Sequence, residues 1–368
     1  MKRIGIDGHM LGNHSGGNES YYSNILQNMN LTDLNIEVFL FLNKDTNASR
    51  YEKKFNIVRF KSDNAFVRNF IELPFLCKKY KLDLIHVQYF IPFYRFCPVV
   101  CTIHDICFEY YSDIFSKKEY VRQKLLIPYA AKKSAAIFTV SEHSKNDIAE
   151  RYSIDRKNIF ITYNAVSNKF YKMTKEELND EDLRSRFKIG KERFLLYVGN
   201  LQPRKNLHRL VNAFIKYINL TKDTAKLVIV GKISMENNDL ISDIMLYHDN
   251  IILTDYVNDE DLVCLYNSAH GFIYPSYYEG FGIPPLEALA CGTPVAVSNA
   301  AAIPEIVGNA GIYFDPFNVE EIVSAIDTIM NDDNTRNKIM SNSIKRVSHF
   351  SWKESADMIV NVYKQLIN

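Results

Sequence analysis

The sequence predicts an α/β protein with two doubly wound domains that face a central cleft, each a parallel sheet with helices on both faces. Three observations predict this fold class. The chain has 368 residues, more than one typical domain of about 150 residues. Short apolar runs rich in Val, Ile and Phe alternate with helical-period segments along most of the chain, as in parallel sheets with crossover helices. One charged stretch interrupts this alternation and divides the chain in two.

Residues 1–170 are predicted to form an N-terminal Rossmann-like domain. Each predicted strand is a short apolar run between polar or turn-forming residues. Seven such runs are enough for one doubly wound sheet. The predicted strands are Arg3 to Asp7, Ile36 to Leu42, Asn56 to Phe60, Leu84 to Gln88, Pro98 to Ile103, Ala136 to Val140 and Ile159 to Tyr163.

Residues 171–192 are predicted to be a linker, because they are highly charged and contain no strand run. The alternation then resumes and predicts a C-terminal Rossmann-like domain over residues 193–351. After Asn318 the pattern is helical, and the last helix, 352–368, is expected to pack back on the first domain. The predicted strands are Phe194 to Val198, Lys226 to Val230, Asn250 to Leu253, Gly271 to Tyr274, Pro294 to Val297 and Gly311 to Phe314, and the helices are Glu320 to Met330, Arg336 to Val347 and Trp352 to Ile367.

Composition and the first residues indicate an ordinary globular protein of a reducing compartment. The chain is 47% hydrophobic and 24% charged, which gives no sign of disorder or of a fibre. Its start, MKRIGIDGHM, lacks the features of a signal peptide, and no stretch approaches the roughly 18 to 20 apolar residues of a membrane span. The six cysteines lack metal-site spacing, so we expect free thiols, no metal and a cytoplasmic location.

The charge is distributed unevenly along the chain. Residues 1–170 hold 24 Lys and Arg against 17 Asp and Glu, and the remainder holds 20 against 26. A basic half on a protein of near-neutral net charge suggests an anionic partner, either nucleic acid or the phosphate-rich face of a membrane, although an ordinary solvated surface gives the same count.

The most informative stretch is PSYYEGFGIPPLEALACGTPV, residues 275–295. A predicted strand ends just before it, Glu279 lies in a glycine-containing loop, and two prolines begin a helix. The backbone N–H groups of Phe281 to Ile283 are therefore predicted at a helix N-terminus, which suits an anionic or hydroxyl-bearing ligand. Glu287 is predicted in the first helical turn, where it could merely complement the helix dipole at about 0.3 to 1 kcal/mol. That reading does not explain Glu279, and carboxylates are good acceptors for sugar hydroxyls.

A second element is LLYVGNLQPRKNLHRLV, residues 195–211. Its strand ends at Gly199, a polar loop carries Arg204 and Lys205, and a helix starts near Asn206. Two adjacent cations at the carboxyl edge of a sheet, next to a helix N-terminus, are well placed for a diphosphate. A lone pair of basic residues is often only a surface feature.

The pair Glu279 and Glu287 in the context EGFGIPPLE resembles the Glu-x7-Glu motif of the retaining glycosyltransferases of family four, which have the GT-B fold. The resemblance implies that Glu279 contacts the donor sugar and that Glu287 bonds the nucleotide ribose. It also implies that Arg204 and Lys205 hold the donor pyrophosphate, so that no metal or other cofactor is needed. The resemblance covers most of the chain and is weak before Cys101.

The first half carries further candidates by the same resemblance. Gly16 and Gly17, before the first helix, correspond to a glycine-rich loop that contacts the donor phosphate; they do not form a G-x-G-x-x-G dinucleotide fingerprint. His104, a weak signal by itself, corresponds to a histidine that positions the donor sugar. The predicted catalytic residues are Glu279, His104, Lys205 and Arg204. The predicted donor-binding residues are Gly16, Gly17, Gly199, Arg204, Lys205, Tyr256, Val257, Glu279, Gly280, Phe281, Gly282, Ile283 and Glu287.

The predicted function is therefore transfer of a hexose, with retained anomeric configuration, from a nucleotide sugar to a glycan or lipid-linked acceptor. The sequence looks most like bacterial mannosyltransferases that use GDP-mannose for surface polysaccharides. A UDP-sugar donor, a nucleotide-sugar epimerase and a two-domain solute-binding protein are the alternatives. The predicted partners are donor and acceptor, with no nucleic acid. The basic residues of the first half suggest peripheral contact with the anionic inner membrane, at Lys78, Lys79, Lys81, Lys117, Lys118, Arg122 and Lys124.

Overall fold

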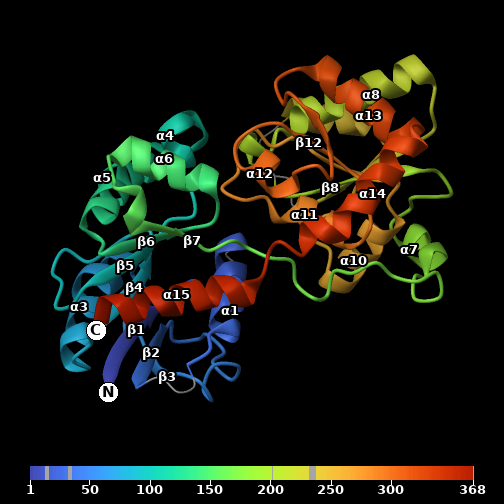
Figure 1. Ribbon diagram of the computed structural model, residues 1–368. Coiled ribbons are helices and arrows are strands. Elements are labelled where there is room, and N and C mark those ends of the chain that lie inside the picture. The colour runs from blue at the N-terminus through green and yellow to red at the C-terminus, as the bar shows by residue number, and fades with distance from the viewer. Residues whose placement is uncertain (13–15, 32–34, 201, 232–237, 368) are drawn as a thin grey trace. The chain divides into compact units, whose positions relative to one another are not determined.

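The computed structural model describes residues 1–12, 16–31, 35–200, 202–231 and 238–367. The chain forms two compact units (Figure 1). Unit 1 contains Met1–Asn164 and Ser351–Asn368, and unit 2 contains Ala165–Phe350. Each unit is a doubly wound α/β domain with a parallel sheet, so the predicted fold class is confirmed. Within the part of the chain that the structure describes, no helix is long and apolar enough to cross a membrane.

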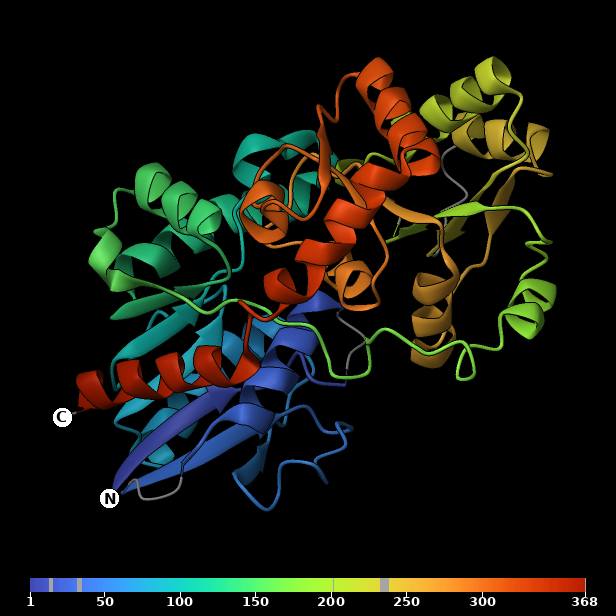
Figure 2. The ribbon, with the colours of Figure 1, turned by 45° about the vertical axis from the view of Figure 1, so that its right-hand side comes forward.

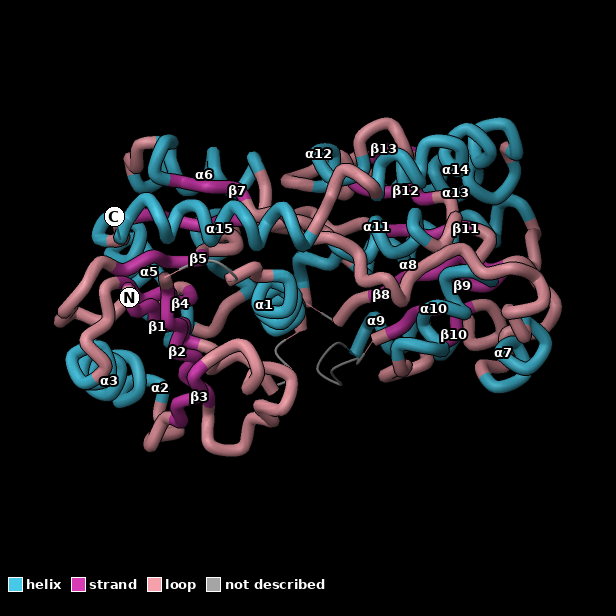
Figure 3. The backbone as a smooth tube through the Cα atoms, turned by 60° about the horizontal axis from the view of Figure 1, so that its bottom comes forward, coloured by secondary structure: helices cyan, strands magenta, loops and turns pink. Residues whose placement is uncertain are grey.

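The sheet of unit 1 has seven strands in the order β3-β2-β1-β4-β5-β6-β7 (Figure 3). All neighbouring pairs are parallel. The order reverses between β1 and β4, which is where doubly wound sheets bind ligands. All seven predicted strands form. Their bounds are β1 Lys2–Asp7, β2 Ile36–Leu42, β3 Asn56–Arg59, β4 Leu84–Gln88, β5 Val99–Thr102, β6 Ala136–Thr139 and β7 Ile159–Ile161.

Helices cover both faces of this sheet. On one face Ile85 and Val87 of β4 pack in a core with residues of α3, α5 and α6. On the other face α15 packs against α1 (Figures 1 and 2), and Tyr363 of α15 bonds to buried His86 of β4. The bounds are α1 Gly17–Asn28, α2 Ala65–Val67, η1 Arg68–Glu72, α3 Leu73–Lys79, α4 Cys107–Tyr110, η2 Ser112–Ile114, α5 Lys117–Lys133, α6 Glu142–Tyr152, η3 Arg156–Asn158 and α15 Trp352–Ile367.

The segment from α2 to α3 is a single helical rod with a π-helical turn in its middle. Asn64 caps its start by accepting hydrogen bonds from the amides of Phe66 and Val67. The turn η1 then widens the helix, and it brings Arg68 and Asn69 into buried positions. Single π-helical turns of this kind are frequent at functional sites.

The sheet of unit 2 has six strands in the order β10-β9-β8-β11-β12-β13. Its order also reverses, between β8 and β11, and every predicted strand forms. The strands are β8 Phe194–Val198, β9 Lys226–Val230, β10 Ile251–Leu253, β11 Gly271–Tyr274, β12 Val295–Ser298 and β13 Ile312–Phe314. The helices are α7 Asp180–Arg186, η4 Pro203–Lys205, α8 Leu207–Thr221, α9 Asn238–Leu246, α10 Asp259–Ser268, α11 Ile283–Ala290, α12 Ile303–Val307, α13 Val319–Asn331 and α14 Asp333–Val347.

The predicted boundary after residue 170 and the predicted linker 171–192 both need correction. Unit 2 begins at Ala165, and the charged stretch contains helix α7, which Asn179 caps by accepting from the amide of Asp182. The single buried residue of α7, Leu183, anchors it, and Arg186 pairs with Asp261 of α10 at 2.7 Å. Few apolar residues are needed to hold so short a helix, so periodicity could not reveal it.

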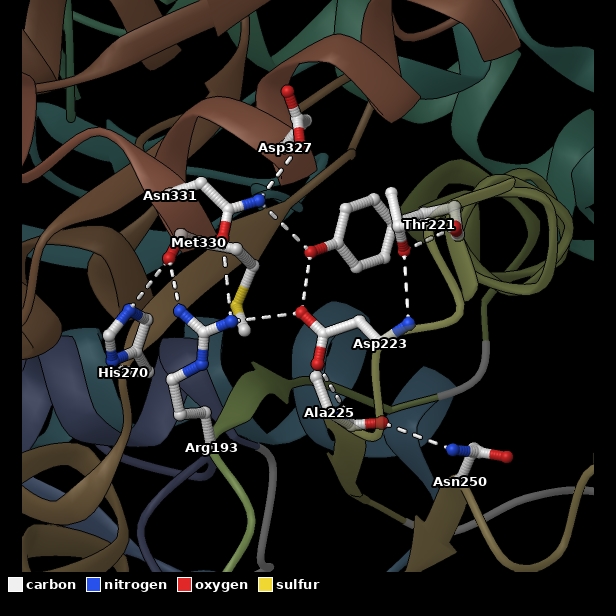
Figure 4. Close-up of polar contacts among 10 residues, drawn as sticks. Arg193, Thr221, Asp223, Ala225, Asn250, His270, Asp327, Met330 and Asn331 are labelled. Carbon is white, nitrogen blue, oxygen red and sulfur yellow. Dashed lines mark hydrogen bonds and ion pairs between the residues drawn. The ribbon is translucent and has the colours of Figure 1, made fainter. Parts of the chain in front are cut away.

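A polar cluster closes the amino-terminal edge of the unit 2 sheet (Figure 4). Arg193, just before β8, donates to the carbonyl of Met330 at 2.6 Å and to Asp223, just before β9, at 2.9 Å. Asp223 also accepts from Tyr217, and His270, just before β11, bonds to the Met330 carbonyl at 3.1 Å. These groups satisfy one another within the fold, which leaves the opposite, carboxyl edge for ligand.

Candidate active site

A polar cluster at the carboxyl edge of unit 2 joins Arg204, Lys205 and Glu279. The two cations lie in η4, after β8, and the carboxylate lies in the loop after β11. Because β8 and β11 are neighbours at the point where strand order reverses, their loops meet. Arg204 Nη1 lies 2.6 Å from Glu279 Oε2, and Lys205 Nζ lies 2.6 Å from Glu279 Oε1. Arg204 also donates to the carbonyl of Tyr278 at 2.9 Å.

Two buried tyrosines complete this cluster, and the sequence analysis missed both. The Tyr274 hydroxyl bonds to Lys205 Nζ at 2.6 Å and donates to Glu279 Oε1 at 2.9 Å. The Tyr197 hydroxyl is buried without a hydrogen-bond partner. A Cβ added to Gly199 would lie 3.1 Å from that hydroxyl, so glycine there gives the ring its room. Both tyrosines sit within apolar strand runs, where an aromatic residue normally signals only core packing.

Charge attraction keeps Glu279 ionised although its side chain is buried. Burial alone would raise the pKa of Glu279, but the neighbouring cations Arg204 and Lys205 outweigh it and hold this pKa at about 2. The carboxylate is therefore the counterion of both cations in the absence of ligand. A buried ion pair that loses one partner costs about 3 to 5 kcal/mol, so an arriving anion must share the cations with Glu279.

The loop after Glu279 leads directly into helix α11. Gly282 precedes the helix with φ +95, and a Cβ there would lie 2.6 Å from Ile303 Cδ1, so only glycine fits both the backbone and the space. Phe281 is buried and packs edge-on against Phe350, with ring centroids 5.4 Å apart. Ligand contacts in this segment would therefore come from backbone amides and the start of α11.

Glu287 lies in the second turn of α11, not in the first turn as predicted. Its Oε2 accepts from the Tyr266 hydroxyl of α10 at 3.0 Å, and its described contacts do not include the Arg204 and Lys205 cluster. Burial raises the pKa of Glu287 to about 7, although the hydrogen bond from Tyr266 lowers it. A carboxyl with this pKa can both donate to and accept from a pair of ribose hydroxyls.

The remaining donor candidates of unit 2 differ in exposure. Tyr256, in the loop after β10, is 76% exposed, whereas Val257 beside it is 8% exposed. Gly280 follows Glu279 in the chain. Gly199 lies beside the side chain of Lys205, since a Cβ added to Gly199 would lie 3.8 Å from Lys205 Cδ. Among the described residues, no group of three or more His, Cys, Asp and Glu side chains could hold a metal ion.

The candidates of unit 1 lie at the carboxyl edge of its own sheet. His104, two residues after β5, is 6% exposed, and its Nε2 is buried without a hydrogen-bond partner. Burial lowers the pKa of His104 to about 3, so the imidazole is neutral. Tyr21 meets its ring edge-on at 4.7 Å between centroids. Gly16 has φ +61, and a Cβ on Gly16 or Gly17 would meet no atom of the described residues within 4 Å. Convergence of the two units on one cleft stays a prediction.

Comparison with known proteins identifies the family. The model of glycosyltransferase family 4 matches residues 16–169, and the model of the group 1 glycosyl transferases matches residues 179–346. The chain is 31% identical over 295 residues to the O-antigen chain mannosyltransferase B of Escherichia coli, covering 78% of this chain and 76% of that protein. The chain belongs to glycosyltransferase family 4. The family and its relatives support a glycosyltransferase, the first of the predicted functions.

A further relative and a solved structure add to this comparison. The family 4 glycosyltransferase is 34% identical over 231 residues to the O-antigen chain mannosyltransferase RfbU of Salmonella typhimurium strain LT2, and this match spans 62% of the chain and 60% of RfbU. A sucrose-phosphate synthase from Thermosynechococcus elongatus has the same fold, with a TM-score of 0.77 over 100% of this chain and 99% of the other, at 18% identity. The GT-B fold predicted for the chain is thereby confirmed.

Proposed function

We propose that this glycosyltransferase moves mannose from GDP-mannose to a glycan or lipid-linked acceptor in bacterial surface polysaccharide synthesis. The names of the two O-antigen mannosyltransferases support the sugar and the pathway class. The observation that carries the proposal is the placement of Arg204 and Lys205 on one carboxylate, Glu279, at the reversal point of the unit 2 sheet.

In the proposed reaction the diphosphate of the donor replaces part of the Glu279 contact and is held by both cations. The acceptor hydroxyl attacks the anomeric carbon from the face that the diphosphate leaves, the bond from that carbon to the phosphate oxygen breaks, and the departing phosphate takes the hydroxyl proton. Configuration is then retained without a protein base. Arg204 and Lys205 stabilise the charge that develops on the leaving phosphate. Two fixed cations supply the charge that a divalent metal would otherwise provide, so we propose a metal-independent enzyme.

His104 positions the donor sugar in this proposal. With its pKa at about 3, the ring does not act as an acid near neutral pH. Its unpartnered Nε2 can instead form one hydrogen bond to a sugar hydroxyl. Glu279 and Glu287 would contact the sugar and the ribose, as the family resemblance implies.

Transfer from a panel of nucleotide sugars tests the proposed function. Purified protein is incubated with GDP-mannose, UDP-glucose or UDP-N-acetylglucosamine and a mannose-terminated oligosaccharide, with and without EDTA. We expect GDP-mannose to give an α-linked product at a rate that EDTA does not change. Transfer from a UDP-sugar and not from GDP-mannose would show that the donor is a UDP-sugar. A β-linked mannose product would exclude retention of configuration. Loss of product formation with EDTA would exclude a metal-independent enzyme.

We also propose that unit 1 docks on the anionic inner membrane. The rod from α2 to α3 exposes Phe66, Ile71 and Phe75 by about three fifths each. Tyr94, in the loop between β4 and β5, is 77% exposed. Lys78 lies over the ring of Phe96, 5.7 Å from its centroid. Exposed aromatic and apolar side chains beside basic ones suit the interface of an anionic bilayer.

Vesicle co-sedimentation tests this docking. We expect the protein to sediment with phosphatidylglycerol vesicles but not with phosphatidylcholine vesicles, and to lose most binding when Phe75 and Tyr94 are both changed to Ser. Equal sedimentation with both vesicle types, or an unchanged double variant, would exclude the proposed surface.

A further inference from the structure

A polar cavity of about 280 Å³ lies in unit 1, and none of the candidate site residues named above is among its described lining residues. It sits at the carboxyl ends of β1 and β2, where the loops that follow these strands face each other. Its lining is polar and carries both signs of charge. The lining residues are Gly12, Asn43, Asp45, Thr46, Asp63 and Arg68.

Cross-links between the two loops hold this cavity open. The Asn43 side-chain amide donates to the carbonyl of His9 at 2.7 Å, and the Thr46 hydroxyl donates to the carbonyl of Leu11 at 3.0 Å. On the outer side, the Arg59 guanidinium donates to three carbonyl oxygens of the loop after β2, at 2.7 to 2.9 Å. The walls are therefore fixed before any ligand arrives, which lowers the entropic cost of binding.

Arg68 is the feature that points to a ligand. It belongs to the π-helical turn η1 and is 7% exposed, and its Nε is buried without a hydrogen-bond partner. Its described contacts are the face of Phe60, 5.7 Å from the guanidinium carbon, and attraction to Asp7. Burial alone would raise the pKa of Asp7, but His9 and then Arg68 lower it. A buried guanidinium nitrogen that lacks a hydrogen bond is costly. Because π-helical turns are frequent at functional sites, the place of Arg68 at the cavity points to a ligand.

Two other buried side chains of unit 1 have polar atoms without a partner among the described residues. Asn69, next to Arg68, is 6% exposed and its Oδ1 has no partner. Gln88 ends β4, the neighbour of β1 across the reversal point, and both polar atoms of its buried amide are unpartnered. Buried polar atoms are normally paired. Neither Asn69 nor Gln88 is among the described residues that line the cavity, so Arg68 is the lining residue that carries the argument for a ligand.

The lining identifies the class of ligand. Carboxylates, an amide, a hydroxyl and a guanidinium together offer donors and acceptors at close spacing, which suits the vicinal hydroxyls of a pyranose. An anionic group would be attracted by Arg68 but repelled by the carboxylates of Asp45 and Asp63. Lys44 Nζ lies 3.3 Å from Asp63 Oδ2 and offsets the charge of that carboxylate. A neutral sugar fits this mixture better than a phosphate.

We propose that this cavity binds one neutral pyranose of the acceptor glycan, with Arg68 as its main hydrogen-bond donor. The assignment rests on the proposed function, in which unit 2 binds the donor. It adds that unit 1 binds the acceptor. Arg68 thus helps to select which sugar is extended, and takes no part in bond cleavage.

Saturation-transfer NMR with methyl α-D-mannopyranoside tests the assignment without requiring turnover. We expect ring-proton signals with the unmodified protein and an affinity at least about tenfold lower in Arg68→Gln, since a charge-assisted hydrogen bond is lost. Asp45→Asn, at an exposed position of the lining, should also weaken binding. Arg50→Gln, at an exposed arginine outside the lining, should not.

Thermal shifts with GDP separate this proposal from the proposed function. The shift should be the same in Arg68→Gln and the unmodified protein, which also establishes that the variant is folded. Unchanged mannoside binding in both Arg68→Gln and Asp45→Asn would overturn the acceptor subsite. Displacement of the mannoside by inorganic phosphate would overturn it too, in favour of an anion site. Neither result affects the donor assignment, which fails only if GDP-mannose is not used.

Discussion

Lys205→Ala is expected to reduce the rate of transfer by about 10²- to 10³-fold, the usual effect of removing one preorganised group that stabilises charge in a transition state. Lys205 Nζ lies 2.6 Å from Glu279 and 2.6 Å from the Tyr274 hydroxyl. Its side chain is 12% exposed, so water cannot replace it efficiently. Most of the loss should appear in kcat, because the charge on the leaving phosphate is greatest in the transition state.

The matched control is Lys216→Ala, at a lysine of the same unit whose ion pair with Glu320 lies at the surface. Surface pairs of this kind contribute about 0 to 1 kcal/mol, so transfer should be unchanged. Initial rates over a range of GDP-mannose concentrations measure both variants, and thermal unfolding verifies that they are folded. Transfer by Lys205→Ala at more than about one third of the unmodified rate would remove Lys205 from the proposed mechanism.

The fold was predictable from the sequence because its strands are buried on both faces. Short runs rich in Val, Ile and Phe, such as residues 36–42 and 226–230, predict buried strands. All thirteen predicted strands form. The exceptions are elements that bury little. Helix α7 is held by one apolar residue and by ion pairs. The π-helical turn η1 depends on one extra residue in a helix, and no hydrophobic period records it.

The site was predictable where charges sit on loops with a recognisable motif. Arg204, Lys205 and Glu279 are charged residues in glycine- or proline-containing loops, and the structure joins them. Tyr274 was hidden because an aromatic residue in a strand indicates packing. The burial of Arg68 could not be predicted, because a single arginine in a basic stretch of sequence normally indicates an exposed, solvated side chain. Its burial follows from the π-helical turn, which sequence alone could not predict.

Glu279→Gln is expected to separate binding from turnover. Glutamine keeps the shape and can still accept hydrogen bonds, but it removes the negative charge that lies 2.6 Å from each cation. The two freed cations should bind GDP about tenfold more tightly, equivalent to about 1.4 kcal/mol. Transfer should nevertheless fall at least about 10²-fold, because the carboxylate proposed to contact the donor sugar is lost. Calorimetric titration with GDP and initial transfer rates measure the two effects.

The same substitution should also lower stability, in a way that pH reveals. The pKa of Glu279 is depressed from 4.5 to about 2, so its ionised form stabilises the fold above pH 4.5, and this contribution is lost as the pH falls towards 2. Glu279→Gln should therefore unfold more easily at pH 7, by up to about 3 kcal/mol, with a smaller deficit at pH 4 and with recovery when GDP occupies the cations. Glu320→Gln, at the surface pair, should show none of these changes. Weaker GDP binding by Glu279→Gln would contradict the competition between carboxylate and diphosphate, since removing a competing anion can only strengthen the attraction for another.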